Sequence, residues 1–98
     1  MTVISVVDFH IKPPMIEEAL RSLGEALGDT RAFEGCIGLD VVQDVDDPSH
    51  VQLIERWTSV QNNTAYRAWR HGAGASNALS PFVEGAVTVT ISEVRPDV

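Results

Sequence analysis

Hydrophobic positions at the start of the chain alternate as they do in a β-strand. Between Thr2 and Ile11 both sets of alternating positions carry apolar side chains, and a strand of this kind is covered on both faces. One set contains Val3, Val7 and Phe9, and the other contains Ile4 and Val6. Lys12 precedes Pro13 and Pro14, and a residue before proline favours an extended backbone, so the strand ends there and a proline opens a helix.

The next segment has a helical pattern of apolar residues. They recur at spacings of four, three and four, which indicates an amphipathic helix with one apolar stripe. The stripe consists of Ile16, Leu20, Leu23 and Leu27. We expect the helix to end within the segment from Gly28 to Gly35.

Two strands and a polar turn follow this helix. The segments Cys36–Gln43 and Val51–Trp57 are rich in β-branched and apolar residues. Between them, Asp44–Ser49 has the Asp and Pro residues of a turn. We therefore expect the two strands to pair in antiparallel fashion.

A second helix is predicted to begin just after Trp57. Thr58 and Gln61 have the spacing of a capping box, in which each side chain satisfies a free backbone N–H of the first turn. A projection at about 100° per residue gathers amides and aromatics on one side. That side contains Gln61, Asn62, Ala65, Tyr66, Ala68 and Trp69. Asn63, Arg67 and Arg70 turn away from it, so we expect Asn63 to be solvated.

The rest of the chain completes the order β-α-β-β-α-β. Residues 70–76 form a break whose glycines could make a lid over a pocket, 77–82 resemble one helical turn, and Ala86–Val94 alternate as a strand. This order predicts an α+β, ferredoxin-like domain over residues 1–98, with an antiparallel four-stranded sheet and both helices on one face. The apolar residues of the other face need a second cover. We predict a homodimer with two-fold symmetry in which the two sheets meet.

Composition narrows the range of partners. Seven basic and fourteen acidic residues give a net charge of −7, and Lys12 is the only lysine. No basic cluster is present to neutralise phosphates, so we expect no nucleic acid and no anionic membrane as a partner. The apolar N-terminus lacks the basic residues of a signal peptide and soon reaches Asp8, so we expect a cytoplasmic protein. Cys36 is the only cysteine, and we expect it to be a small buried hydrophobe.

The stretch FEGCIGLDVVQDVDDPSHVQLIERWTS, residues 33–59, resembles the core of the antibiotic biosynthesis monooxygenase (ABM) family of dimeric α/β barrels. Members of that family typically have a Pro-Gly or Glu-Gly step, a hairpin rich in Asp and Pro, and a strand that ends in Trp followed by a polar residue and Ser. The matching positions are Gly35, Asp46, Asp47, Pro48, Glu55, Trp57 and Ser59. The resemblance implies a dimeric α/β barrel.

The resemblance also implies one of two kinds of oxygen chemistry. Quinone-forming members use neither metal nor flavin: a phenol or quinol loses a proton, its anion passes an electron to oxygen, and the pocket positions the substrate. Haem-degrading members carry an Asn on strand one, a Trp in helix two and an axial His. Here the strand-one position falls at Val7, and the axial His position falls near Ser76 or, with Trp69 aligned to the family Trp, near Leu79. Neither alignment supplies the His, so we expect the cofactor-independent chemistry and keep haem as the alternative.

Several residues are candidates for the site. An aromatic slot for a ring substrate could be formed by Trp57, Tyr66, Trp69, Phe9 and Phe82, although aromatics at helical spacing also form ordinary core. Asn62 could bond a substrate oxygen or, equally, a backbone group. His71, where the second helix should end, is the candidate general base for a phenolic proton, and the alternative is an exposed capping residue.

Other polar clusters predict no further chemistry. His10 and Asp8 share one side of strand one, where we expect a structural pair. Residues 44–47 lack the Gly and the later Glu of a calcium loop, so we expect no metal site. Two functions follow: oxidation of a small aromatic phenol or quinol with O2, or a non-catalytic dimeric module that binds an aromatic metabolite or haem.

Overall fold

The computed structural model describes residues 1–98 and has the predicted order of elements. Four strands and two helices make up the fold: β1 Val3–Ile11, α1 Ile16–Ala32, β2 Cys36–Gln43, β3 His50–Trp57, α2 Val60–Arg70 and β4 Val83–Glu93. Short 3-10 turns at Pro13–Met15 and Ser80–Phe82 precede α1 and β4. The strands lie in the order β2-β3-β1-β4, and every neighbouring pair is antiparallel. The ferredoxin-like α+β fold is therefore confirmed.

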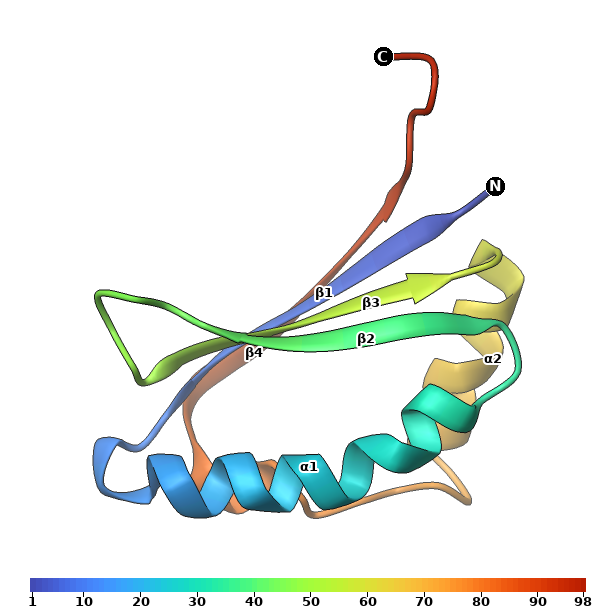
Figure 1. Cartoon of the computed structure of the whole chain (residues 1–98). Helices are drawn as coiled ribbons and strands as arrows, with labels where there is room; N and C mark the ends of the chain where they lie inside the picture. Colours follow the sequence, from blue (N-terminus) through green and yellow to red (C-terminus); the bar gives the residue numbers. More distant parts are fainter.

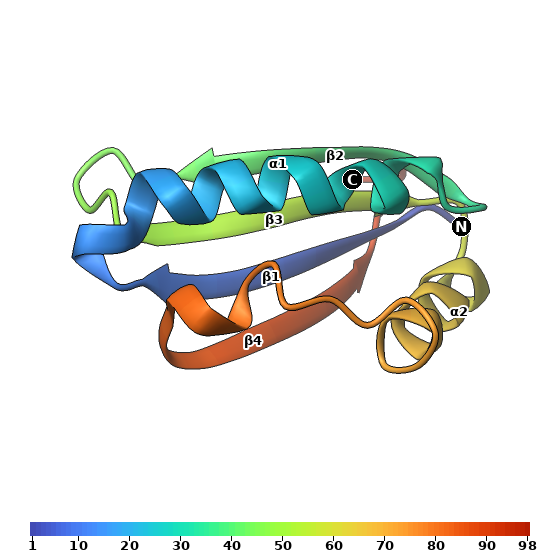
Figure 2. The same ribbon diagram turned by 90° about the horizontal axis from the view of Figure 1, so that it is seen from below.

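Both helices lie on one face of the sheet, at different places. Figure 1 shows α1 running along the sheet and α2 standing at one end of it. In the view from below, α1 covers β2 and β3, while the segment between α2 and β4 returns along the sheet beside α1 (Figure 2).

Strand β4 differs from its expectation in where it begins, and its pairing with β1 is irregular. Strand β4 begins at Val83, three residues before Ala86, because Lys12 N–H and Ile11 are already paired with this segment. The pairing of β1 with β4 shifts register between Asp8 and His10, beside Gly85, whose φ of 80° belongs to the left-handed region that glycine tolerates.

The apolar core is divided into two clusters. The larger one packs α1 on the sheet and includes Phe9, Leu23, Leu27, Val51 and Phe82. The smaller one lies under α2 and consists of Val3, Trp57 and Tyr66, with Phe33, Cys36 and Trp69 packed against it. Because the two helices bury separate clusters, the boundary between the clusters is not filled by either.

The opposite face of the sheet carries no helix. Ile4, Val6 and Ile54 are only half-buried there, and Val42 is 40% exposed. An uncovered face of this kind is what the sequence predicts. No helix in the structure combines the length and the apolar composition that crossing a membrane requires.

Candidate functional site

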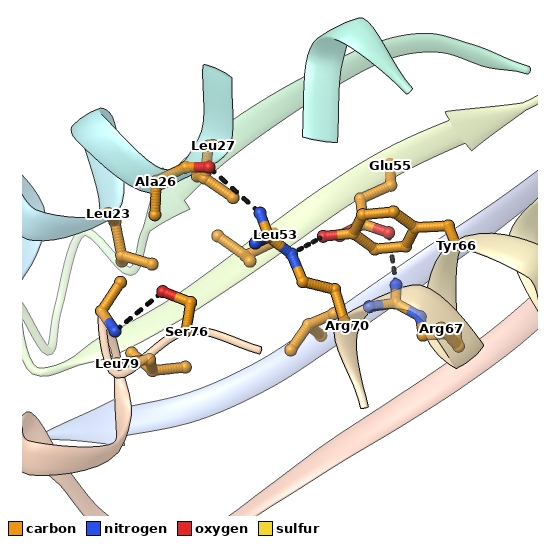
Figure 3. Close-up of a pocket in the computed structure, with 12 residues that line it drawn as sticks. Leu23, Ala26, Leu27, Leu53, Glu55, Tyr66, Arg67, Arg70, Ser76 and Leu79 are labelled. Atoms are coloured by element: carbon orange, nitrogen blue, oxygen red, sulfur yellow. Dashed lines mark hydrogen bonds and ion pairs between the residues drawn. The ribbon is translucent and has the colours of Figure 1, made fainter. Parts of the chain in front are cut away.

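A cleft of about 200 Å³ opens between α1, α2 and the sheet, at the boundary of the two core clusters. One end is apolar and is formed by Leu23 and Leu27 of α1, Val7 of β1 and Leu53 of β3. The other end is polar and is formed by Glu55, Tyr66, Arg67 and Arg70. The third side is formed by the returning segment itself, through Ser76, Ala78 and Leu79. Figure 3 shows Tyr66, Arg67 and Arg70 beside Glu55, with Leu23, Leu27 and Leu79 on the other side and Leu53 between the two groups.

Glu55 is the buried carboxylate of this cleft. It lies on β3 opposite Ser5 of β1, on the face that the helices cover, and only 1% of it is exposed. Arg67 forms an ion pair with Glu55 Oε1 through Nη2, and the same nitrogen donates to Ser5 Oγ at 2.7 Å. Trp57 Nε1 donates to Glu55 Oε1 at 3.2 Å. These bonds hold the carboxylate in one orientation at the cleft wall.

Burial raises the pKa of Glu55 above its ordinary value of 4.5, because desolvation disfavours the charged form. The positive charge of Arg67 and the hydrogen bonds from Arg67, Trp57 and Ser5 act in the opposite direction, and burial outweighs them. A carboxylate with a raised pKa is a stronger base than an exposed one. It is therefore suited to accept a proton from a weak acid such as a phenol.

Arg70 links three segments around the cleft. Its Nε donates to Tyr66 OH at 2.8 Å, and its Nη2 donates to Thr30 Oγ1 at 2.9 Å and to the Ala26 carbonyl at 3.0 Å. Nη1 donates to the carbonyl of Gly74 in the returning segment at 3.1 Å. The hydroxyls of Tyr66 and Thr30 are themselves 2.6 Å apart. Figure 3 shows the Arg70 side chain extending from α2 to Ala26 of α1.

The buried side of α2 is not the side that the helical projection favours. Residues spaced at i, i+3, i+4 and i+7 face the sheet: Asn63, Tyr66, Arg67 and Arg70. Ala65 and Ala68 are exposed, and Trp69 is only half-buried. The expectation that Asn63 is solvated and that the arginines point away was wrong. Glu55 and Ser5 of the sheet offer partners to Arg67, and the Ala26 carbonyl of α1 offers one to Arg70. Asn63 is buried on the same side of the helix.

Two polar groups of this side have no partner within the chain. Asn63 is 0% exposed, and neither its Oδ1 nor its Nδ2 makes a hydrogen bond. Arg67 Nε is also buried and unpaired. Buried polar atoms are nearly always hydrogen-bonded, so an unpaired amide and guanidinium nitrogen on one side of a helix are exceptional. Hydrogen-bonding capacity therefore remains available beneath α2.

Asn62 serves the start of α2 instead of facing the cleft. The N-cap is Ser59, one residue after the expected Thr58, and its Oγ accepts the backbone N–H of Asn62 at 3.1 Å. Asn62 Oδ1 in turn accepts from Thr58 Oγ1 at 2.8 Å and from Ser59 Oγ at 2.7 Å. The side chain also packs against Gly35, where a Cβ would lie 2.3 Å from Asn62 Cγ.

Of the predicted aromatic residues, only Tyr66 lines the cleft. Trp57 is fully buried beside it, with the two ring centroids 4.9 Å apart. Trp69 lies further out, against Gly74 and under the guanidinium of Arg70 at 4.8 Å. Phe9 and Phe82 belong to the larger core cluster and do not reach the lining. Trp57 and Trp69 thus pack beside Tyr66 outside the lining, and the aromatic slot stays a prediction.

The histidines lie away from the cleft. His71 is the exposed C-cap of α2, as its alternative interpretation predicts, and it is not among the lining residues. Asp8 pairs with His50 at 2.8 Å rather than with His10, which instead stacks on the His50 ring. Asp44 also bonds His50, and both carboxylates raise the pKa of this imidazole. No group of three or more His, Cys, Asp or Glu is arranged to hold a metal ion.

The sequence matches the antibiotic biosynthesis monooxygenase family over residues 2–79, which is most of the chain. The chain belongs to the ABM family. No curated protein matches the sequence of this chain.

Solved structures share the fold of this ABM domain over nearly the whole chain. A conserved protein from Methanosarcina mazei has a TM-score of 0.85 at 19% identity, covering 97% of this chain and 94% of its own. An antibiotic biosynthesis monooxygenase has a TM-score of 0.80 at 23% identity, covering 96% and 99%. A protein from Mycobacterium tuberculosis has a TM-score of 0.74 at 24% identity, covering 97% and 96%. At these identities the likeness shows the fold alone.

The cleft of the ABM domain does not fit haem. The residues that line it include no His, Cys or Met that could serve as an axial ligand, and the hydroxyl of Tyr66 is already bonded to Thr30 and Arg70. A volume of about 200 Å³ is also far below that of a porphyrin site. We therefore derive no chemistry through this group.

Two site residues on strands, Glu55 and Ser5, can be recognised from the sequence by their position in the apolar alternation. Glu55 continues the alternation of Val51, Leu53 and Trp57, so a charged residue stood on a face that is otherwise apolar. Ser5 interrupts the alternation of β1 in the same way, and antiparallel pairing places it opposite Glu55. A polar residue on the buried face of a strand was the signal that could have located the site.

Proposed function

We propose that this ABM domain is a monooxygenase that oxidises a single-ring phenol or quinol with molecular oxygen and without a cofactor. The observation that carries the proposal is Glu55, a buried carboxylate with a raised pKa at the polar end of an otherwise apolar cleft. Membership of the ABM family supports the class of reaction.

The size of the cleft supports a single-ring substrate. An apolar cavity of about 150 Å³ is large enough for benzene. The cleft, at about 200 Å³, has room for one aromatic ring with small oxygen substituents. A polycyclic quinol would need the returning segment or α1 to move aside.

The reaction needs no external reductant. A phenol and one O2 give a para-quinone and one water, and a quinol and one O2 give a hydroxylated quinone and one water. In both cases one oxygen atom enters the ring, the other leaves as water, and the substrate supplies all the electrons. The step that the protein assists is loss of the phenolic proton, because the phenolate transfers an electron to O2 more readily than the phenol does. In this scheme Glu55 takes the proton, and the nearby guanidinium of Arg67 stabilises the anion that forms.

The remaining candidates have supporting roles in the proposal. Tyr66 forms the wall on which the substrate ring rests, and Trp57 orients Glu55 through its indole N–H. Trp69, Phe9 and Phe82 set the shape of the walls behind the lining. The cleft excludes water and orients the ring, which are the main contributions of such a site.

Asn62 and His71 stay predictions as catalytic residues. Both lie outside the lining, so in our scheme Glu55 performs the proton transfer that the sequence suggested for His71. A closing motion of the segment that follows His71 would be required to bring His71 to the substrate, and Asn62 would have to leave its bonds at the start of α2.

The test is oxygen uptake with a panel of single-ring phenols and quinols, corrected for autoxidation in buffer. Hydroxylated anthrones, which have three rings, are the comparison that the cleft should not admit. Glu55→Gln keeps the shape of the side chain and removes the base, and we expect uptake to fall about 100-fold or more. Glu25→Gln, an exposed change on α1, is the matched control and should retain full uptake. An equal loss in His71→Asn would return the proton-accepting role to His71.

A different outcome would identify the alternative function. Saturable binding of the same quinols, without uptake above the buffer rate, would show that the ABM domain is a binding module for an aromatic metabolite and would overturn the proposed oxidation.

We also propose that the functional unit is a homodimer joined through the open face of the sheet, because Ile4, Val6 and Ile54 are only half-buried there.

A further inference from the structure

The charged groups of the cleft do not balance. Its lining contains two guanidinium groups, Arg67 and Arg70, and one carboxylate, Glu55, so positive charge exceeds negative charge by one even when Glu55 is ionised. The chain as a whole carries −7. A locally cationic cleft in an acidic protein attracts an anion, and it does so most strongly where walls of low dielectric constant surround it.

Arg70 is the source of the imbalance. Arg67 is neutralised by its ion pair with Glu55, whereas every partner of Arg70 is uncharged: a phenol, a hydroxyl and two backbone carbonyls. The rings of Tyr66 and Trp69 lie under its guanidinium at 5.5 and 4.8 Å, which offsets part of its desolvation but supplies no negative charge. A half-buried cation without an anionic partner is costly to the folded chain alone.

Donors for an anion are also present. The four hydrogen bonds of Arg70 leave one of its five N–H groups free, on Nη1. Arg67 adds a buried Nε without a partner, one helical turn away on the same side of α2. Guanidinium groups match the geometry of a carboxylate.

We propose that the substrate of this cleft is an aromatic acid, a phenol or quinol whose ring also bears a carboxylate, and that Arg70 determines this specificity. The proposal rests on the proposed function for the hydroxyl end of the molecule. The ring hydroxyl faces Glu55 and the carboxylate faces Arg70. The carboxylate of the substrate supplies the negative charge that the cleft lacks, so the complex is neutral. It stays neutral when the phenolic proton moves to Glu55, because the phenolate then replaces Glu55 as the partner of Arg67.

The test measures binding, without turnover. Dissociation constants are determined under nitrogen, by calorimetry, for 2,5-dihydroxybenzoate and for its uncharged analogue 2,5-dihydroxybenzamide. We expect the acid to bind at least about tenfold more tightly at low ionic strength, and this preference to shrink at about 1 M NaCl, where the Debye length falls to about 3 Å. Equal affinity for acid and amide in the native protein would overturn the proposal without any variant.

Variants then assign the preference to Arg70. Arg70→Met should bind the acid and the amide about equally, whereas Arg70→Lys, which keeps the charge, should retain most of the preference. Arg21→Met removes an exposed arginine of α1 and should leave the preference unchanged. An undiminished preference in folded Arg70→Met would exclude Arg70 as its source. If that variant does not fold, loss of the preference in Arg70→Lys would contradict the charge argument instead.

The two proposals fail in different ways. Tight binding of the acid with no oxygen uptake on admission of air would leave the aromatic acid as the ligand and overturn the oxidation. Uptake with neutral quinols that bind as tightly as the acids would support the oxidation and overturn the proposed specificity.

Discussion

At the scale of single residues, the proposed oxidation depends on where Glu55 lies. The same side chain on the open face of β3 would be a solvated carboxylate, whereas here it is 1% exposed and is held by Arg67 and Trp57. Burial is what raises its pKa, and the arginine beside it only partly reverses the shift. In the proposed reaction, the base and the group that stabilises the phenolate would thus be one ion pair.

The raised pKa predicts the pH dependence of the oxidation. Because the ionised form of Glu55 accepts the proton, kcat/KM for an uncharged quinol should rise with pH through an apparent pKa above 4.5 and then level off. The measurement is the initial rate of oxygen uptake, from acidic to neutral pH, after subtraction of the buffer rate. Glu55→Gln should lack this rise, and a rise that persists in the variant would assign it to another group.

At the scale of the element, the first turn of α2 is held by a contact between Asn62 and Gly35. In the sequence this glycine appears only as part of a Glu-Gly step. Gly35 has a φ of 88°, and the Asn62 side chain lies where its Cβ would be. Asn62 in turn bonds Ser59 and Thr58 at the start of the helix. The glycine therefore permits the cap, and the cap directs the polar side of α2 toward the sheet.

This arrangement predicts a large cost for Gly35→Ala. A left-handed backbone costs a residue with a Cβ about 1–2 kcal/mol, and displacement of Asn62 from the cap adds about 1 kcal/mol. We expect urea denaturation to show a total loss of about 2–3 kcal/mol at constant protein concentration. Gly28→Ala is the control, because nothing lies within 4 Å of its Cβ and α1 should gain slightly in stability. A loss in Gly35→Ala no larger than about 0.5 kcal/mol would contradict the account.

At the scale of the whole molecule, the uncovered face of the sheet requires a partner, and we propose a second copy. The central residues of that face, Ile4, Val6 and Ile54, come from the two inner strands of the sheet. An apolar face at the centre of a sheet is normally covered.

The homodimer predicts the effect of a charge on this face. Val6→Glu should weaken association about 100-fold or more, because an unpaired carboxylate would be buried between the two sheets. Val45→Glu places the same charge in the β2–β3 turn, where Val45 is 96% exposed, and should not affect association. Sedimentation velocity at micromolar concentration reports both. A native chain that sediments as a 10.7 kDa monomer would refute the homodimer.

The sequence by itself determined the order of elements, the antiparallel sheet and the presence of apolar residues on both faces of β1. These follow from local periodicity and from turn residues, which act over a few positions and leave their pattern in the chain. The side that α2 buries could not be obtained in this way. Either the aromatic or the charged residues of α2 could face the sheet. Which set does so depends on the hydrogen-bond and ion-pair partners that the sheet provides, here Ser5 and Glu55.

Only the tertiary structure decided that Asn63, Arg67 and Arg70 turn inward. It brought Ser5 and Glu55 together across two strands that lie 50 residues apart, and it placed the Ala26 carbonyl and Thr30 hydroxyl within reach of α2. A guanidinium group is buried only where such partners meet it, because the loss of hydration has to be offset by hydrogen bonds or by an opposite charge. The location of the cleft and its positive charge follow from that pairing, which no single segment of the chain encodes.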